Sequence, residues 1–111
     1  MYERWLPVER EMNRLGWEPV TGARCVEKNV LTERFGGDSK MIFSIYGPQK
    51  GAREVTLILD EGCLRLPGKD AVVRDAFSKG ELKSVRTEKG LEIRNIRLDA
   101  DGTGAIWVER R

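Results

Sequence analysis

Carboxylates, lysines, serines and two cysteines are the side chains that could carry out chemistry in this chain, since its 111 residues include no histidine. The absence of imidazole excludes Ser-His-Asp and Cys-His catalytic groups and removes the commonest metal ligand. Cys25 and Cys63 are too few to complete a zinc site. No serine stands in a Gly-x-Ser-x-Gly elbow. We therefore expect no catalytic residue, no metal and no cofactor, and we favour a non-enzymatic protein.

Carboxylates at turns are the residues that a magnesium-dependent nuclease would use. Such an enzyme needs two or three carboxylates and a lysine on adjacent strand ends. Glu81 and Lys83 have a suitable spacing, but a predicted helix separates them from the carboxylates that precede them. Turns also favour aspartate whatever the function, because its side chain binds nearby backbone amides. A nuclease is therefore only our third hypothesis. The carboxylates concerned are Asp38, Asp60, Glu61, Asp99 and Asp101.

A basic run lies between residues 79 and 97. If the strands of this region place its side chains on one sheet face, they would form a basic surface for nucleic acid. However, the net charge of the chain is only +2, and no aromatic residue for base stacking lies between Phe77 and Trp107. Nucleic-acid binding is therefore the alternative function. The basic residues are Lys79, Lys83, Arg86, Lys89, Arg94 and Arg97.

Large aromatic residues give the leading hypothesis. Trp107, Tyr46 and Trp17 are candidates for binding a partner, because large amphipathic rings are common anchors at protein interfaces. Two short helices are too little to cover a whole sheet, so one sheet face stays open for a partner or a second copy of the chain. We predict a small intracellular module that acts through protein–protein interaction, as a regulator, inhibitor, chaperone or immunity-type protein.

Two helices are predicted to support these residues. The first covers residues 6–16, with Pro7 in its first turn and Gly16 as its C-terminal cap. The second covers residues 71–79, where Val73 and Phe77 have helical spacing. Each helix would lay its apolar side on a sheet.

Strands account for most of the remaining chain. Residues 30–35 and 41–46 are predicted to form a hairpin, although residues 21–35 also fit a helix. Residues 54–59 form a central strand that is apolar on both faces. Residues 82–87, 91–98 and 103–109 form a meander, with a β-bulge near Arg94 and Asn95 because the apolar alternation changes phase there.

The predicted fold is a single α+β domain over residues 1–111. It has a mainly antiparallel sheet of five to six strands with two short helices, in the order α-βββ-α-βββ. The longest uncharged stretch, residues 41–49, is too short to span a bilayer, and the first turns are too charged for a signal segment. We therefore expect a cytoplasmic protein with no membrane partner.

Overall fold

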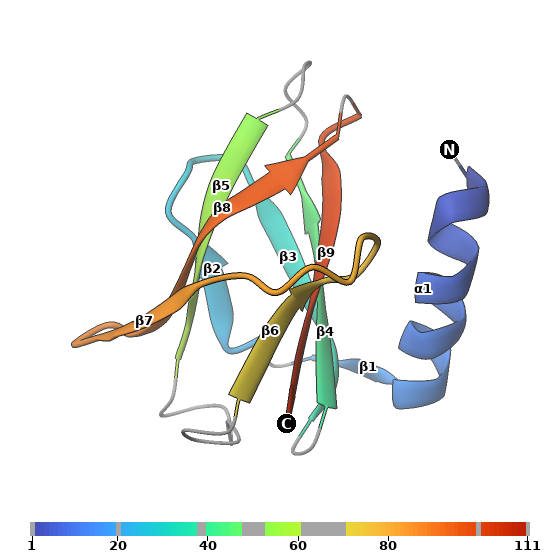
Figure 1. The fold of residues 1–111 in the computed structure, drawn as a ribbon, viewed down its shortest axis with the longest axis horizontal. Coiled ribbons are helices and arrows are strands. Elements are labelled where there is room, and N and C mark those ends of the chain that lie inside the picture. The colour runs from blue at the N-terminus through green and yellow to red at the C-terminus, as the bar shows by residue number, and fades with distance from the viewer. Residues whose placement is uncertain are drawn as a thin grey trace.

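The computed structural model describes residues 2–19, 21–37, 40–47, 53–60, 71–99 and 101–110, and within these ranges the chain forms two antiparallel sheets and one helix. The sheets pack face to face, and the helix lies against the outer side of the larger sheet (Figure 1). The α+β class is confirmed. The prediction of one sheet with two helices is matched only in part, because the described residues form one helix and two sheets.

The five-stranded sheet has the order β1-β3-β4-β9-β6, and the four-stranded sheet has the order β2-β5-β8-β7. The helix, α1, is Tyr2–Leu15. The larger sheet contains β1 (Trp17–Glu18), β3 (Leu31–Gly37), β4 (Lys40–Tyr46), β6 (Ala71–Asp75) and β9 (Thr103–Arg110). The smaller sheet contains β2 (Ala23–Cys25), β5 (Arg53–Leu59), β7 (Ser84–Thr87) and β8 (Gly90–Leu98).

Alternate residues of the central strands point between the sheets and form the main core. Met41, Phe43 and Ile45 of β4 are at most 2% exposed. Ile42, which points to the outer side, is equally buried beneath the helix. β4 is therefore covered on both faces, which explains its nearly continuous apolar run. The other buried members of this core are Val55, Leu57, Leu59, Val73, Leu91, Ile93, Ile96, Leu98, Ile106 and Val108.

Helix α1 begins at Tyr2, earlier than predicted. Pro7 therefore lies in the second turn, where its ring removes one backbone hydrogen bond. The end of the helix is as predicted. Gly16 follows it with a φ of 89°, and its amide donates to the Met12 carbonyl at 2.9 Å. Val8 and Met12 pack against the outer side of the five-stranded sheet.

Residues 71–79, predicted as a second helix, form a strand and a turn instead. β6 pairs with β9, and Val72 and Val73 are buried on opposite faces of the sheet. Burial on both faces suits a strand of β-branched residues and overrides the helical spacing of Val73 and Phe77. The Asp75 carboxylate accepts the Phe77 amide at 2.8 Å and so stabilises the turn that ends the strand.

The last three strands exist as predicted, but they do not form a meander. β7 and β8 pair in the four-stranded sheet, whereas β9 crosses to the other sheet and lies between β4 and β6. The Asp99 carboxylate holds the crossing turn, because it accepts the Thr103 amide at 3.1 Å and the Thr103 hydroxyl at 2.9 Å. Ile106 faces inward and Ala105 outward, and both are buried, so β9 occupies an interior position in the larger sheet.

The hairpin of β3 and β4 is confirmed, with Leu31 directly opposite Tyr46. The region 21–35 is therefore not helical: it contains β2 and most of β3. β5 is an interior strand with buried residues on both faces, also as predicted. In the described part of the chain, no helix is long and apolar enough to cross a membrane.

The predicted β-bulge is also confirmed. Arg94 and Asn95 of β8 oppose the single residue Thr56 of β5. Asn95 has a φ of 60°, and its side-chain amide donates to Glu54 at 3.0 Å. The bulge returns Ile96 to the core face, which explains the change of phase in the sequence.

Candidate functional site

Helix α1 covers only part of the outer side of the five-stranded sheet. Beneath the helix, Ile42 and Ala105 are 0% and 1% exposed. Farther along the same side, Leu31 lies opposite Tyr46, and Tyr46 lies opposite Thr103. Leu31 is 65% exposed and Tyr46 is 48% exposed. A row of side chains across three strands is thus left uncovered by the helix.

This row borders a cavity of about 300 Å³, which we call the outer-face groove. Trp5 is the contribution of α1 to its wall. The Trp5 ring packs edge to face on Phe77, with ring centroids 4.8 Å apart, so its position is fixed by the turn after β6. The groove therefore lies between the helix and the part of the sheet that the helix leaves uncovered. Its lining residues are Trp5, Leu31, Glu33, Ser44, Ile45, Tyr46 and Thr103.

Among the described residues that line the groove, Glu33 is the one with a carboxylate. It lies opposite Ser44 on the same side of the sheet as Leu31 and Tyr46. Within the described ranges no cation or hydrogen-bond donor contacts its side chain. The groove thus combines apolar and aromatic walls with a negative charge that the described chain does not neutralise.

Trp107, the first predicted anchor, lies elsewhere on the outer side and packs against the helix cluster. Its ring is contacted by two ammonium groups: Nζ of Lys40 lies 4.2 Å and Nζ of Lys79 lies 3.4 Å from the ring centroid. Its indole Nε1 is buried and has no hydrogen-bond partner among the described residues. Trp107 is therefore part of the internal packing of the molecule.

The charges around Trp107 form a chain of ion pairs with the helix. Glu11 accepts hydrogen bonds from Arg14 and, at 3.1 Å, from Lys40. The Arg14 hydrogen bond is the largest cause that lowers the pKa of Glu11, to about 2, and Lys40 adds to it. Burial, and then the Lys40 ammonium, lower the pKa of Lys79 below its ordinary value. These contacts attach α1 to β4 and β9.

The three predicted aromatic anchors do not meet in one place. Tyr46 lines the outer-face groove. Trp17 is 57% exposed, but it belongs to β1 and lies opposite Phe35, just after the end of the helix. Trp107 lies on β9 opposite Ile42, and the ammonium groups of Lys40 and Lys79 contact its ring. Of the three, Tyr46 lines the cavity described above.

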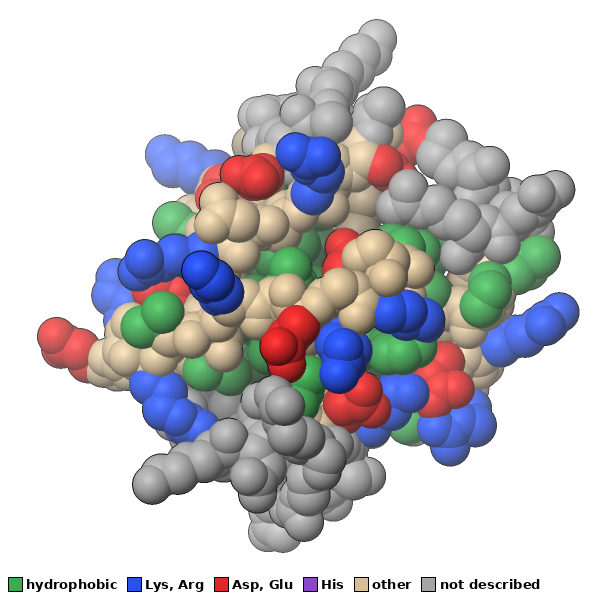
Figure 2. Space-filling view, in the orientation of Figure 1, with side chains coloured by type: hydrophobic (Ala, Val, Ile, Leu, Met, Phe, Trp, Pro, Cys, Tyr) green, Lys and Arg blue, Asp and Glu red, His purple; other side chains and the backbone are tan. Residues whose placement is uncertain are grey.

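The predicted basic residues are divided between two regions. Lys79 lies against Trp107 on the five-stranded sheet. Lys83, Arg86 and Lys89 are exposed on or beside β7. Figure 2 shows basic side chains around the β7 end of the molecule with acidic side chains among them. On β8, Arg94 pairs with Glu92 at 3.3 Å. Arg97 is exposed near the end of the same strand.

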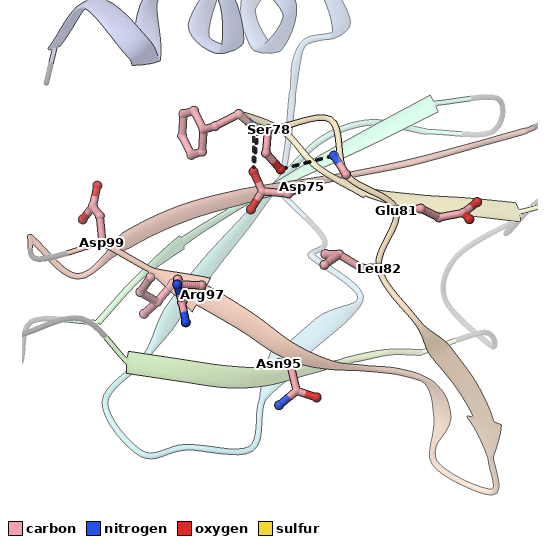
Figure 3. A pocket seen from close by; sticks show the side chains of 10 residues that line it. Asp75, Ser78, Glu81, Leu82, Asn95, Arg97 and Asp99 are labelled. Atoms are coloured by element: carbon pink, nitrogen blue, oxygen red, sulfur yellow. Dashed lines mark hydrogen bonds between the residues drawn. The ribbon is translucent and has the colours of Figure 1, made fainter.

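A second cavity, of about 460 Å³, lies where the turn after β6 approaches the end of β8. Its carboxylates are those of Asp75, Glu81 and Asp99, and in Figure 3 they extend from separate segments in different directions. Asp75 and Asp99 accept backbone amides of their own turns. These two carboxylates therefore stabilise the turns that follow β6 and β8.

The carboxylates considered for a nuclease form no metal site within the part of the chain that the structure describes. Among the described residues no group of three or more His, Cys, Asp and Glu side chains could hold a metal ion. Asp60 is exposed after β5, and Asp101 is exposed in the crossing turn. Asp38, Glu61 and Cys63 lie outside the described residues.

Comparison with known proteins gives no relative from which a function could be transferred. No protein-family model matches the chain, and no curated protein or solved structure matches it significantly. The candidate site therefore depends on geometry alone. Leu31 and Glu33 were not among the site residues predicted from the sequence. The available signal was the spacing of Leu31 and Glu33, because residues two apart on a strand lie on the same face.

Proposed function

We propose that this protein is a binding module that acts through protein–protein interaction, with the outer-face groove as its contact surface. The observation that carries the proposal is the exposed pair of Leu31 and Tyr46 beside a cavity walled by Trp5. Exposed apolar side chains that adjoin one another, with an aromatic ring at the centre, are typical of protein interfaces. The helix leaves this part of the sheet face open to such a partner.

A photo-crosslinking amino acid at position 46 tests this proposal. Benzoylphenylalanine in place of Tyr46 keeps an aromatic ring in the groove and reacts with any protein bound there. The matched control places it at Val85, which is 47% exposed, close to the 48% of Tyr46, but lies in the other sheet. We expect adducts with a protein from position 46 and not from position 85. Equal yields at both positions would contradict the proposal.

A second variant links the adduct to the groove. Leu31→Ser removes the apolar neighbour opposite Tyr46 without emptying the core, since Leu31 is 65% exposed. We expect it to reduce the yield from position 46. The mass of the adduct identifies the partner, which includes the case of a second copy of this chain.

Nucleic-acid binding is the second candidate, and one observation favours it. All four residues of β7 are exposed, and the β7–β8 hairpin projects from the sandwich in Figure 1. Lys83, Arg86 and Lys89 lie on or beside this strand. A projecting two-stranded ribbon with basic side chains is a shape that fits a DNA groove. The acidic neighbours Glu81 and Glu88 weaken this surface, so we rank it second.

A further inference from the structure

The walls of the outer-face groove have the chemistry that attracts an organic cation. Trp5 and Tyr46 supply aromatic rings from two different elements, α1 and β4. The face of an aromatic ring is electron-rich and attracts ammonium and guanidinium groups. Glu33 adds a full negative charge to the same lining. Two aromatic rings and a carboxylate around one cavity favour a positively charged group over a neutral apolar one.

Elsewhere on the same sheet face, an aromatic ring and a carboxylate are already contacted by cations of the chain itself. The Trp107 ring is contacted by the ammonium groups of Lys40 and Lys79, and Lys40 also pairs with Glu11 at 3.1 Å. There, the chain provides its own cations for an aromatic ring and a carboxylate. In the groove, by contrast, no described cation contacts Glu33.

We propose that the outer-face groove binds a cationic side chain, lysine or arginine, of the partner polypeptide. We choose a cation because the Glu33 carboxylate and the rings of Trp5 and Tyr46 all attract a positive charge. We choose a polypeptide because Leu31 is 65% exposed, and a small free cation would leave this side chain uncovered. This inference rests on the proposed protein-binding function and specifies what that function recognises.

Short peptides test the inference directly. The probes are acetyl-Ala-Ala-Lys-Ala-Ala-amide and the same peptide with norleucine, a neutral side chain of similar shape, in place of lysine. Binding is followed by backbone amide shifts of the ¹⁵N-labelled full chain, with affinities expected in the millimolar range. We expect the lysine peptide to shift residues 31–33, 44–46 and 103, and the norleucine peptide to bind about fivefold more weakly. Equal binding of the two peptides would overturn the inference.

Glu33→Gln isolates the charge without changing the shape of the groove. We expect about a fivefold loss of affinity for the lysine peptide and no change for the norleucine peptide. Glu88→Gln is the matched control, because Glu88 is an exposed glutamate in the turn between β7 and β8. The amide spectrum of each variant shows directly that it is folded. An unchanged affinity in Glu33→Gln contradicts the role of the carboxylate.

Binding of butylammonium chloride distinguishes recognition of a polypeptide side chain from recognition of a free cation. We expect it to bind more weakly than the lysine peptide, since it covers none of the surface around Leu31. If it binds as tightly, the groove recognises a free cation and the polypeptide is the wrong source. If crosslinking from position 46 succeeds while the peptides show no preference for charge, the protein-binding function stands and the cation inference fails.

Discussion

Nζ of Lys79 lies 3.4 Å from the centroid of the Trp107 ring and also donates to the Ala76 carbonyl at 3.1 Å. Lys79 has a φ of 67°, so the turn after β6 adopts a left-handed conformation that directs this side chain back over the sheet. The contact fixes the turn on the outer face. It also leaves the Trp107 ring partly covered by the lysine side chain.

The first prediction concerns the pH dependence of this contact. Burial first, and the Lys40 ammonium second, lower the folded-state pKa of Lys79 from 10.5. The folded chain therefore binds this proton less tightly than the unfolded chain does. As a result, the free energy of unfolding rises as the pH passes from the lowered pKa towards 10.5. We expect Lys79→Met to remove this rise in the free energy of unfolding, measured by urea denaturation between pH 7 and pH 10. Lys89→Met, in the exposed β7–β8 turn, should keep it.

The second prediction concerns Glu11, whose pKa shift has the opposite consequence. Its pKa falls from 4.5 to about 2, mainly because of the Arg14 hydrogen bond and also because of Lys40. Its contribution is therefore complete above pH 4.5 and is lost as the pH falls towards 2. Because the pair is partly exposed, we expect Glu11→Gln to lower the free energy of unfolding by only about 1 kcal/mol at pH 7. The two proteins should converge in urea titrations near pH 2.

Glu9→Gln is the control for this measurement, since Glu9 lies on the same helix. This variant should keep the pH dependence of the wild type, because the ion pairs of Glu11 remain. A difference between wild type and Glu11→Gln that grows as the pH falls would contradict the assigned ion pairs.

The third prediction concerns the close approach of Gly90 to β5. Gly90 has a φ of 132°, and a Cβ atom there would lie 2.0 Å from the Leu59 carbonyl oxygen. Both the backbone angle and the backbone clash oppose a side chain, so we expect Gly90→Ala to destabilise the fold by about 3 kcal/mol. Gly37→Ala is the matched strand control, because its Cβ would meet only the flexible end of Arg34 at 3.3 Å. Thermal unfolding of the two variants measures the difference.

Local sequence patterns were sufficient to predict features that depend only on residues close together in the chain. The end of α1 at Gly16 and the bulge at Arg94 and Asn95 are examples, since each depends on neighbouring residues alone. Val72 and Val73 were misassigned because two adjacent buried residues fit a helix as well as a strand covered on both sides. Only the pairing of β6 with β9 decides between them.

The candidate site was predictable only in part, for a similar reason. Tyr46 could be selected from its residue type, but the exposure of Leu31 and the place of Glu33 depend on where α1 ends above the sheet. Trp107 is of the same residue type as an interface anchor, and two lysines from distant segments cover it. Contacts between distant segments are not visible in local spacing.

The fourth prediction concerns the bulge in β8. Asn95 has a φ of 60°, which β-branched residues adopt with strain. We expect Asn95→Val to destabilise the fold by about 1–2 kcal/mol in urea denaturation. Asn95→Gly should be close to neutral, because glycine adopts this angle freely and the lost hydrogen bond to Glu54 is exposed. A larger loss in the glycine variant would show that the side-chain bond, rather than the backbone, holds the bulge.

The fifth prediction concerns the β7–β8 hairpin and the second candidate function. If the hairpin binds nucleic acid, Lys83→Glu, Arg86→Glu and Lys89→Glu together should abolish retention of a labelled duplex at low salt, and wild-type binding should weaken steeply with added salt. Charge reversal at the exposed Arg10 is the control, because Arg10 belongs to α1, which lies away from β7 in Figure 1. Binding that the Arg10 variant loses equally would reflect net charge alone. Absence of wild-type binding at low salt would leave the outer-face groove as the candidate interaction site, because the hairpin's basic residues would then have no nucleic-acid partner.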